Sequence, residues 1–511
     1  MNKKKKSIYT ALSSVALTVL NGLLGLIITR QIILNYGSDF NGLNSTANQF
    51  IAMLMIVEGG FTLATNVALF KPLTDQNYKK INSILSATKN IFNKIGLFFL
   101  GIGILATVVF TVVVESSLSW YIVSLTLFMT VISTCFKLMY ATKYRILIQT
   151  EHREYILHFI SLFTLVISQL LIIVVISVEG HMLFIRLSTM LGSIINSLMI
   201  VYVCKKNYSY MNFDIQPNYK AIKGTKDVFI QKLTGIIYTT LPIIAISTTA
   251  GTIFASVYAV YNSIFTLLKS FINAIVNAPR MGLGNLISTN SKDVVLKVFY
   301  QYQFIVINVM FTFLTSTSVL IMPFISLYTD GFSDVDYINV KLAAILVLIT
   351  LFEIIHIPSG NLINMSGNFK IARKIQTFSM VTLVIMMVIG NLLIGFYGVL
   401  LAVFITAVLL AIFEVGYVHL YYFNSNIYVF MKILMTTFGA SVFLVGIELL
   451  LIPNINGYVT FFLFGMLLFT INGLIILMIN LIVNNQITKE VGLILYAMIE
   501  KKLPRKIKSI S

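Results

Sequence analysis

The sequence predicts an all-α polytopic membrane protein, and three observations lead to that class. The chain has 511 residues, of which 58% are hydrophobic and only 11% are charged, whereas soluble proteins carry about 25% charged residues. Its mean hydropathy is +0.91. The apolar residues recur in blocks of about 18 or more, long enough to cross a hydrocarbon layer of ~30 Å as helices. These observations exclude a water-soluble protein.

Fourteen blocks satisfy this length requirement, at a rise of about 1.5 Å per helical residue. The connections between them are too short for an independently folded soluble domain. Any function must therefore reside in the spans or at their ends. The predicted spans are residues 11–34, 43–69, 91–114, 118–142, 155–178, 180–203, 228–249, 252–277, 297–328, 339–361, 372–395, 396–420, 428–452 and 456–484.

The basic residues alternate from one connection to the next. If the amino terminus is cytoplasmic, 33 of the 36 Lys and Arg residues fall on the cytoplasmic side. The other three, Arg30, Arg186 and Lys341, lie near the opposite ends of their spans. This asymmetry predicts that both termini are cytoplasmic. The net charge of +18 then reflects topology and contact with anionic membrane lipids, and no nucleic-acid partner is expected.

The span starts of the first half nearly coincide with those of the second half at an offset of 214 residues. This predicts two pseudo-symmetric six-helix lobes followed by two C-terminal helices. A chain of evenly sized spans can also show such a coincidence without a duplication. The predicted domains are an N-terminal lobe (1–203), a cytoplasmic linker (204–227), a C-terminal lobe (228–420), two additional spans (421–484) and a basic cytoplasmic tail (485–511).

Two lobes of this kind enclose a cleft, and rocking them would give alternating access, which is a transporter architecture. Bends at Pro242, Pro323 and Pro358, within predicted spans, would suit such movement. We find no phosphate-binding Gly-rich loop, nucleophile motif or Cys/His cluster with metal spacing. The sequence therefore predicts a transporter, without enzymatic activity, bound metal or other cofactor.

Three basic residues are candidates to meet an anionic substrate group inside the membrane: Arg30, Lys232 and Lys269. Ionisable side chains at bilayer depth cost at least about 2.5 to 3.5 kcal/mol each, so they usually face a cavity or a partner. The alternative for Arg30 is an anchor at the outer interface, and for the two lysines it is snorkelling to the headgroups. Arg186, at the outer end of its span, is predicted to be structural.

Three further residues are candidates for coupling transport to H⁺ or Na⁺: Glu58, Glu353 and His356. Glu58 lies near the middle of the second span, where a carboxylate is protonated, paired or part of an ion pathway; pairing with Arg30 is the structural alternative. Glu353 and His356 share a helix face and could carry protons or a cation, or form a local polar pair. Glu414 is predicted to be structural.

The first 90 or so residues contain a set of spaced residues that resembles a known pattern. They are Arg30-Gln31-Ile32-Ile33, Tyr36-Gly37, Gly42-Leu43, Gln49, Glu58-Gly59-Gly60, Ala64, Leu69 and Lys71-Pro72-Leu73. This set resembles the opening of bacterial polysaccharide flippases of the Wzx type, which belong to the multidrug/oligosaccharidyl-lipid/polysaccharide (MOP) exporter superfamily. The rest of the chain resembles that superfamily through topology only.

The resemblance implies a flippase of the bacterial cytoplasmic membrane. Its substrate would be an undecaprenyl-pyrophosphate-linked oligosaccharide, moved to the outer leaflet for capsule or O-antigen synthesis, with a polysaccharide polymerase and glycosyltransferases as partners. Arg30, Lys232 and Lys269 would hold the diphosphate, which cannot cross hydrocarbon without paired cations. The family also suggests ion coupling, for which Glu58 and Glu353 are the candidates.

Two other functions are compatible with a membrane-embedded chain. A MATE-like drug or cation antiporter would have the same fold, although it would need a dominant acidic cavity, and the buried charges here are mixed or basic. A polysaccharide polymerase or ligase would be expected to carry a long outer loop, and the predicted outer connections are short.

Overall fold

The computed structural model describes residues 3–54, 56–222, 226–277, 279–453 and 455–502. Within these ranges every regular element is a helix, as the sequence predicts. Thirteen helical segments among the described residues are long and apolar enough to cross a membrane, close to the fourteen predicted. A lipid environment favours this outcome, because a helix satisfies its own backbone hydrogen bonds without water. The chain is a multi-pass membrane protein.

The chain forms two compact units. Unit 1 comprises Met1–Leu267, Gly331–Asp336 and Met380–Val403, and unit 2 comprises Leu268–Asp330, Tyr337–Ser379 and Phe404–Ser511. Helices α9, α14 and α15 contribute residues to both units. The predicted lobe boundaries at residues 203 and 420 stay a prediction.

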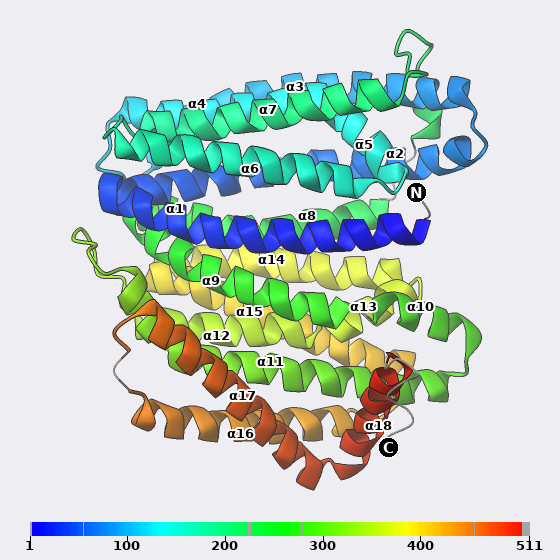
Figure 1. Ribbon diagram of the computed structural model, residues 1–511, viewed down its shortest axis with the longest axis vertical. Coiled ribbons are helices and arrows are strands. Elements are labelled where there is room, and N and C mark those ends of the chain that lie inside the picture. The colour runs from blue at the N-terminus through cyan, green and yellow to red at the C-terminus, as the bar shows by residue number, and fades with distance from the viewer. Residues whose placement is uncertain (1–2, 55, 223–225, 278, 454, 503–511) are drawn as a thin grey trace. The chain divides into compact units, whose positions relative to one another are not determined.

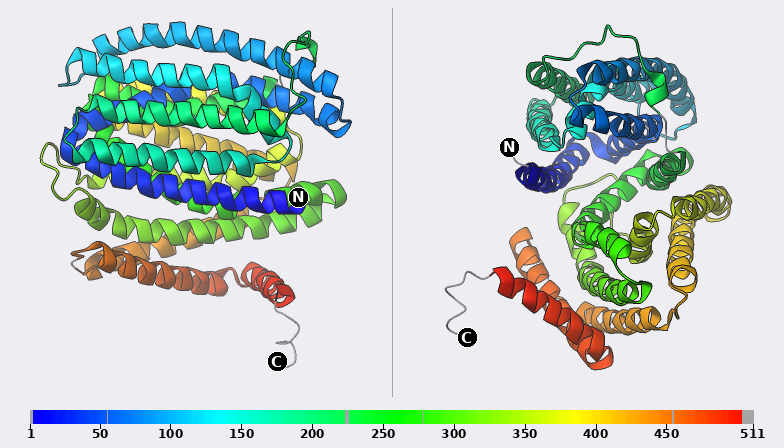
Figure 2. Two further views of the ribbon diagram at one scale, coloured as in Figure 1. Left: turned by 45° about the horizontal axis from the view of Figure 1, so that its top comes forward. Right: turned by 90° about the vertical axis from the view of Figure 1, so that its right-hand side faces the viewer.

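Unit 1 is built from long helices that run alongside one another, with α3, α4, α6 and α7 forming neighbouring ribbons in Figures 1 and 2. The elements from the amino terminus onward are α1 (Lys3–Leu54), α2 (Ile56–Thr74), α3 (Tyr78–Val113), α4 (Trp120–Phe136), a π-helical turn η1 (Lys137–Ala141), α5 (Thr142–Thr150), α6 (Glu154–Ser177), α7 (Leu183–Asn207), a 3₁₀ turn η2 (Tyr219–Ala221), α8 (Lys226–Thr249) and α9 (Thr252–Asn277).

Gly37 separates the first two predicted spans. It divides α1 with φ 82° and ψ 168°, a backbone conformation that residues other than glycine rarely adopt. The second predicted span, 43–69, therefore runs from the later part of α1 into α2, with residue 55 outside the described residues. Among the described residues, Leu12–Phe50 is one of the thirteen segments that are long and apolar enough to cross a membrane, and it includes this kink.

Asp39, just before that second span, forms hydrogen bonds with two other parts of unit 1, the segment before α4 and the start of α9. Its carboxylate accepts hydrogen bonds from Ser116 Oγ at 2.8 Å, from Ser117 N at 2.6 Å and Ser117 Oγ at 2.5 Å, and from Thr252 Oγ1. Gly42, one turn later, packs so close to Thr252 that an added Cβ would lie 1.7 Å from its carbonyl oxygen. The chain therefore requires glycine at position 42 for this close approach of α1 and α9.

Unit 2 is organised around α11, the most deeply buried of the described spans. Helix α11 packs against α12, α16, α17 and α18. The elements that follow α9 are α10 (Arg280–Thr289), α11 (Lys292–Tyr328), α12 (Val340–Ile355), α13 (Ile357–Met365), α14 (Phe369–Ile394), α15 (Phe396–Gly416), a π-helical turn η3 (Tyr417–Tyr422), α16 (Tyr428–Leu451), α17 (Tyr458–Val483) and α18 (Asn485–Lys502).

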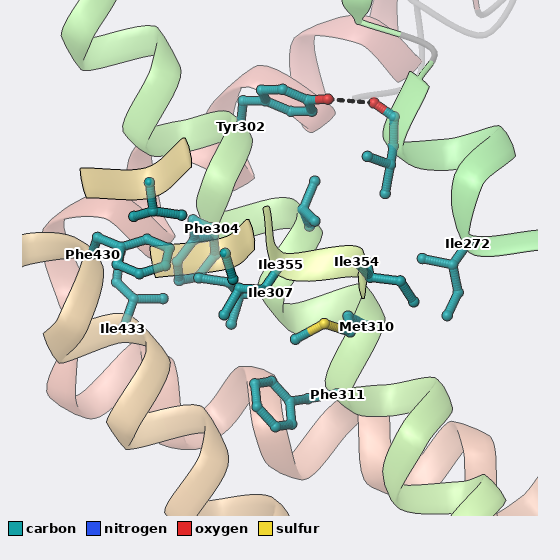
Figure 3. Packing of buried hydrophobic residues seen from close by; sticks show 14 of the residues in the cluster. Ile272, Tyr302, Phe304, Ile307, Met310, Phe311, Ile354, Ile355, Phe430 and Ile433 are labelled. Atoms are coloured by element: carbon teal, nitrogen blue, oxygen red, sulfur yellow. Dashed lines mark hydrogen bonds between the residues drawn. The ribbon is translucent and has the colours of Figure 1, made fainter. Parts of the chain in front are cut away.

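A large apolar core fills unit 2. Figure 3 shows Ile307, Met310 and Phe311 of α11 packed near Ile354 and Ile355 at the end of α12. The hydroxyl of Tyr302 donates a hydrogen bond of 2.6 Å to the carbonyl oxygen of Val276, and so satisfies the polar end of a buried ring. This packing fixes the end of α12, which carries Glu353 and is followed directly by His356.

The predicted proline bends have different outcomes. Pro242 and Pro323 lie inside α8 and α11, which continue through them. Pro358 follows a break, because α12 ends at Ile355 and α13 begins at Ile357. The helix break at Pro358 places His356 at the junction of two helices.

Candidate functional site

Two groups of charged residues inside the spans stand out, one in each unit. In unit 1, Arg186 borders a polar cavity, called here the Arg186 cavity. In unit 2, Lys269, Glu353, His356 and Glu414 form two pairs of a basic and an acidic side chain, called here the paired-charge cluster. The two groups differ in how their charges are balanced, and each is described separately.

Arg186 lies in the first turn of α7 and is only 4% exposed. Its Nε donates to Thr130 Oγ1 at 2.6 Å, and its Nη1 donates to Asn44 Oδ1 at 2.9 Å. Nη1 and Nη2 both donate to Asn48 Oδ1, each at 3.0 Å. In the part of the chain that the structure describes, all of these partners are neutral. The guanidinium is thus held firmly but its charge is not balanced.

The Arg186 cavity has a volume of about 350 Å³. Asp and Glu are absent from its described lining, which is rich in hydroxyl and amide side chains. The lining residues come from α1, α4, α6 and α7 and are Gly25, Ile28, Thr29, Ile32, Asn44, Asn48, Met129, Thr130, Ser133, Thr134, Gln169, Ile172, Ile185, Arg186, Thr189, Met190 and Ser193.

The sequence carries a signal for this site that our predictions did not use. Asn44 and Asn48 are four residues apart on one helix, so their amides lie on the same face. Two amides one turn apart within an apolar span indicate a polar interior partner, and Arg186 is that partner. We assigned Arg186 a structural role because it lies near the end of its span, and its place in a cavity was not predicted.

In the paired-charge cluster, Lys269 on α9 contacts Glu353 on α12. Lys269 Nζ lies 2.9 Å from Glu353 Oε2, and the two side chains are 23% and 16% exposed. The structure therefore joins a predicted substrate cation to a predicted coupling carboxylate. The two residues are far apart in sequence, and this pairing was not predicted.

The second pair joins His356 to Glu414 on α15. His356 Nδ1 lies 2.9 Å from Glu414 Oε2, and the Glu414 side chain is 1% exposed. Gly360, one turn after His356, leaves room for this carboxylate, since an added Cβ would lie 2.6 Å from Glu414 Oε2. Glu353 and His356 are three residues apart, as the shared-face prediction assumed, but each has its partner on another helix.

The remaining predicted residues lie elsewhere. Glu58 is 3.9 Å from Arg145 Nη1 on α5, rather than paired with Arg30 as the structural alternative proposed. Arg30 is part-buried on α1 and does not line the Arg186 cavity, although its neighbour Thr29 does. Lys232 is exposed on α8.

The six predicted site residues divide between the two units. Arg30, Lys232 and Glu58 belong to unit 1, whereas Lys269, Glu353 and His356 belong to unit 2.

The two groups suit different chemistry. Histidine is the residue type whose charge changes near neutral pH, and a carboxylate beside it can share its proton. The paired-charge cluster therefore contains the side-chain types that proton transfer requires. An arginine keeps its charge under the same conditions, so the Arg186 cavity is permanently cationic.

Comparison with solved structures identifies the fold. No protein-family model matches the chain, and no curated protein matches its sequence. A MATE multidrug resistance transporter of the MOP superfamily, in an inward-facing conformation, has a TM-score of 0.63 at 14% identity, over 83% of this chain and 98% of that chain. The lipid II flippase MurJ, in an inward closed conformation, has a TM-score of 0.63 at 14% identity, over 91% of this chain and 98% of that chain.

A third similar structure is the MATE multidrug transporter DinF-BH, solved as a complex. It has a TM-score of 0.57 at 16% identity, over 81% of this chain and 94% of that chain. The chain therefore shares its fold with transporters of the MOP superfamily and with a lipid flippase over nearly the full length of those proteins. The predicted fold class is confirmed.

Proposed function

We propose that this chain is a flippase of the Wzx type. It moves an undecaprenyl-diphosphate-linked oligosaccharide from the cytoplasmic to the outer leaflet of a bacterial cytoplasmic membrane, with both termini in the cytoplasm. Polysaccharide polymerase and glycosyltransferases are its proposed partners. The likeness to the lipid II flippase MurJ, over 91% of this chain, supports a lipid-linked substrate.

One observation favours this substrate over a cationic drug. Three carboxylates inside the two predicted lobes, Glu58, Glu353 and Glu414, each lie within ion-pair distance of a basic residue. A fourth, Glu448, lies on α16 in the added C-terminal pair of spans, where it accepts a hydrogen bond from an asparagine. A cation exporter needs a carboxylate available to its substrate, and these three carboxylates of the predicted spans are engaged. A diphosphate instead needs cations, for which the proposed ligands are Arg30, Lys232 and Lys269.

The Lys269–Glu353 contact suggests how an ion gradient could drive the cycle. While Glu353 is ionised, Lys269 is engaged at 2.9 Å. Protonation of Glu353 removes its charge and releases Lys269 to bind the diphosphate. The His356–Glu414 pair, three residues along the chain from Glu353, would supply or accept that proton. We therefore propose H⁺ rather than Na⁺ as the coupling ion.

The test is a flipping assay in proteoliposomes that contain the full chain and a fluorescent polyprenyl-diphosphate oligosaccharide. Lys269→Ala and Arg30→Ala should each slow the appearance of label in the opposite leaflet by about tenfold or more, as expected when about 1.4 kcal/mol or more of binding is lost. Lys341→Ala, which removes an exposed lysine of α12, is the matched control and should flip normally. Normal flipping by the Lys269→Ala/Arg30→Ala double variant would contradict the assignment.

Coupling is tested in the same vesicles by imposing a pH gradient or a sodium gradient. The wild type should respond to the pH gradient. Glu353→Gln mimics the protonated carboxyl, so the variant should flip at a rate independent of that gradient. A response of the wild type to sodium alone would overturn the choice of proton.

The similarity to MATE transporters favours one second candidate, a drug or cation antiporter. Efflux of a lipophilic cationic dye from the same vesicles, without movement of the labelled lipid, would establish it instead.

A further inference from the structure

The proposed flippase function makes no use of the Arg186 cavity, where a buried charge has no counter-charge among the described residues. The hydrogen-bond acceptors of Arg186, which are Thr130, Asn44 and Asn48, are all neutral. In the described part of the chain the cavity lining includes no Asp or Glu. Neutral dipoles orient a guanidinium and partly offset its lost hydration, but they do not cancel its charge. An anion in the cavity would do so.

A second polar group in the same wall lacks a partner. The side-chain oxygen of Gln169, on α6, is buried without a hydrogen bond in the described structure, and Gln169 lines the cavity. An unsatisfied buried polar group is costly unless water or a ligand completes it. The Gln169 amide can offer its N–H groups to an anion or its oxygen to a water that hydrates one. This observation is independent of the Arg186 contacts.

The remaining walls supply donors and room. The hydroxyl groups of Thr29 and Ser193 line the cavity, and hydroxyls can donate a hydrogen bond to an anion. The hydroxyls of Ser133 and Thr189, also in the lining, already donate to the carbonyl oxygens of Thr130 and Arg186. The volume of about 350 Å³ exceeds the roughly 30 Å³ that one water occupies in the liquid. A chloride ion with several waters, or a phosphate ion, therefore fits. Asn48, which accepts from the Arg186 guanidinium, is exposed, so the cavity is not fully enclosed on this side.

We propose that the Arg186 cavity is a binding site for a small inorganic anion, which contacts the guanidinium of Arg186 and neutralises it. The walls belong to α1, α4, α6 and α7 of unit 1, so occupancy ties these four helices together. A diphosphate group on a lipid carrier shares the same chemistry, but it would have to bring its prenyl chain with it. The free ion is therefore assigned, and this assignment does not depend on the transported substrate.

The chain carries its own reporter for the test. Cys135 and Cys204 are free and buried, and they are the two cysteines of the sequence. A thiol-reactive fluorophore therefore follows unfolding of the purified full-length protein in detergent. Melting temperature is measured at constant ionic strength while gluconate, a larger organic anion, is replaced by chloride, bromide or inorganic phosphate.

For the wild type we expect a saturable rise in melting temperature as chloride or phosphate replaces gluconate. Because general salt effects also stabilise folded proteins, the decisive quantity is the difference from Arg186→Met, which should lose the saturable part. Arg186→Lys keeps the charge but not the bidentate fork, and should raise the half-saturating concentration by about tenfold, equivalent to ~1.4 kcal/mol. Lys341→Met, at an exposed position, should behave as the wild type.

Two further measurements keep the proposal open to refutation if Arg186→Met does not fold. Gln169→Leu changes the wall without removing the charge and should weaken the chloride effect. Crystals grown in bromide should show anomalous scattering within hydrogen-bond distance of the Arg186 guanidinium. The absence of that signal, or an identical salt response in wild type and Gln169→Leu, would overturn the site. Loss of the chloride effect on adding a polyprenyl diphosphate would overturn the free-ion assignment.

Discussion

The Arg186 cavity and the paired-charge cluster place charge in membrane spans in two different ways. In the cluster each base meets an acid, at 2.9 Å in both pairs. In the cavity Arg186 meets only neutral acceptors among the described residues. The comparison separates two uses of buried charge: a pair of opposite charges can be switched by one proton, whereas an arginine surrounded by neutral dipoles stays charged.

The difference has an energetic consequence. Removing one partner of a buried ion pair leaves the other charge uncompensated, while removing both can be nearly neutral. Removing an acceptor from Arg186 leaves one N–H unsatisfied but no new charge. Variants of the cluster should therefore show larger effects and stronger coupling than variants of the cavity wall.

The largest expected effect is at the His356–Glu414 pair. His356→Leu leaves Glu414, 1% exposed, without its base and should lower the free energy of unfolding by about 3 to 5 kcal/mol. The double variant His356→Leu/Glu414→Leu should recover most of this loss. Denaturant unfolding in detergent, followed through the buried thiols, measures both. A double variant as unstable as the sum of the single variants would show that the pair does not interact.

The same cluster shows how far the sequence determines the site. Glu353 and His356 were recognised because a carboxylate and an imidazole three residues apart in an apolar span are conspicuous. Their partners, Lys269 and Glu414, lie on other helices, and the choice of partner depends on how helices pack. Hydropathy does not contain that information, since apolar side chains of many kinds can face either lipid or a neighbouring helix.

The fold itself was more predictable, because lipid leaves the backbone little choice. Hydropathy located nearly all the spans, and Pro358 marked a real helix break. The interior position of Arg186 was not predicted from the sequence. Its position near the outer end of a predicted span indicated a structural role, and only packing against Asn44 and Asn48 shows that it is interior.

A smaller effect is expected in the wall of the Arg186 cavity. Thr130→Val keeps the shape of the side chain but removes the acceptor 2.6 Å from Arg186 Nε. Loss of a hydrogen bond to a charged group should lower the free energy of unfolding by about 1.5 to 3 kcal/mol. Thr88→Val is the matched control: Thr88 is also buried, but its hydroxyl bonds the carbonyl of Ile84 in its own helix. Equal losses in the two variants would mean that Arg186 gains nothing from Thr130.

The smallest effect is expected at a salt bridge near the protein surface. Glu490 on α18 lies 3.0 Å from Lys297 and accepts a hydrogen bond from Gln301, both on α11. The Lys297 contact, followed by the Gln301 hydrogen bond, lowers the pKa of Glu490. Such exposed pairs contribute about 0 to 1 kcal/mol. The lowered pKa means that the contribution is present above the unfolded value of about 4.3 and is lost as the pH falls through the folded value.

Hydrogen exchange of the α18 amides measures this contribution, after correction for the intrinsic pH dependence of exchange. Protection in the wild type should fall slightly as the pH drops below about 4.3. Glu490→Gln cannot ionise, so its protection should be a little lower at neutral pH and should change less on acidification. If the variant keeps the pH dependence of the wild type, the docking of α18 on α11 does not depend on this charge. The decrease in the expected stability effect from Glu414 to Glu490 would then reflect burial alone, and pairing at the surface would contribute nothing.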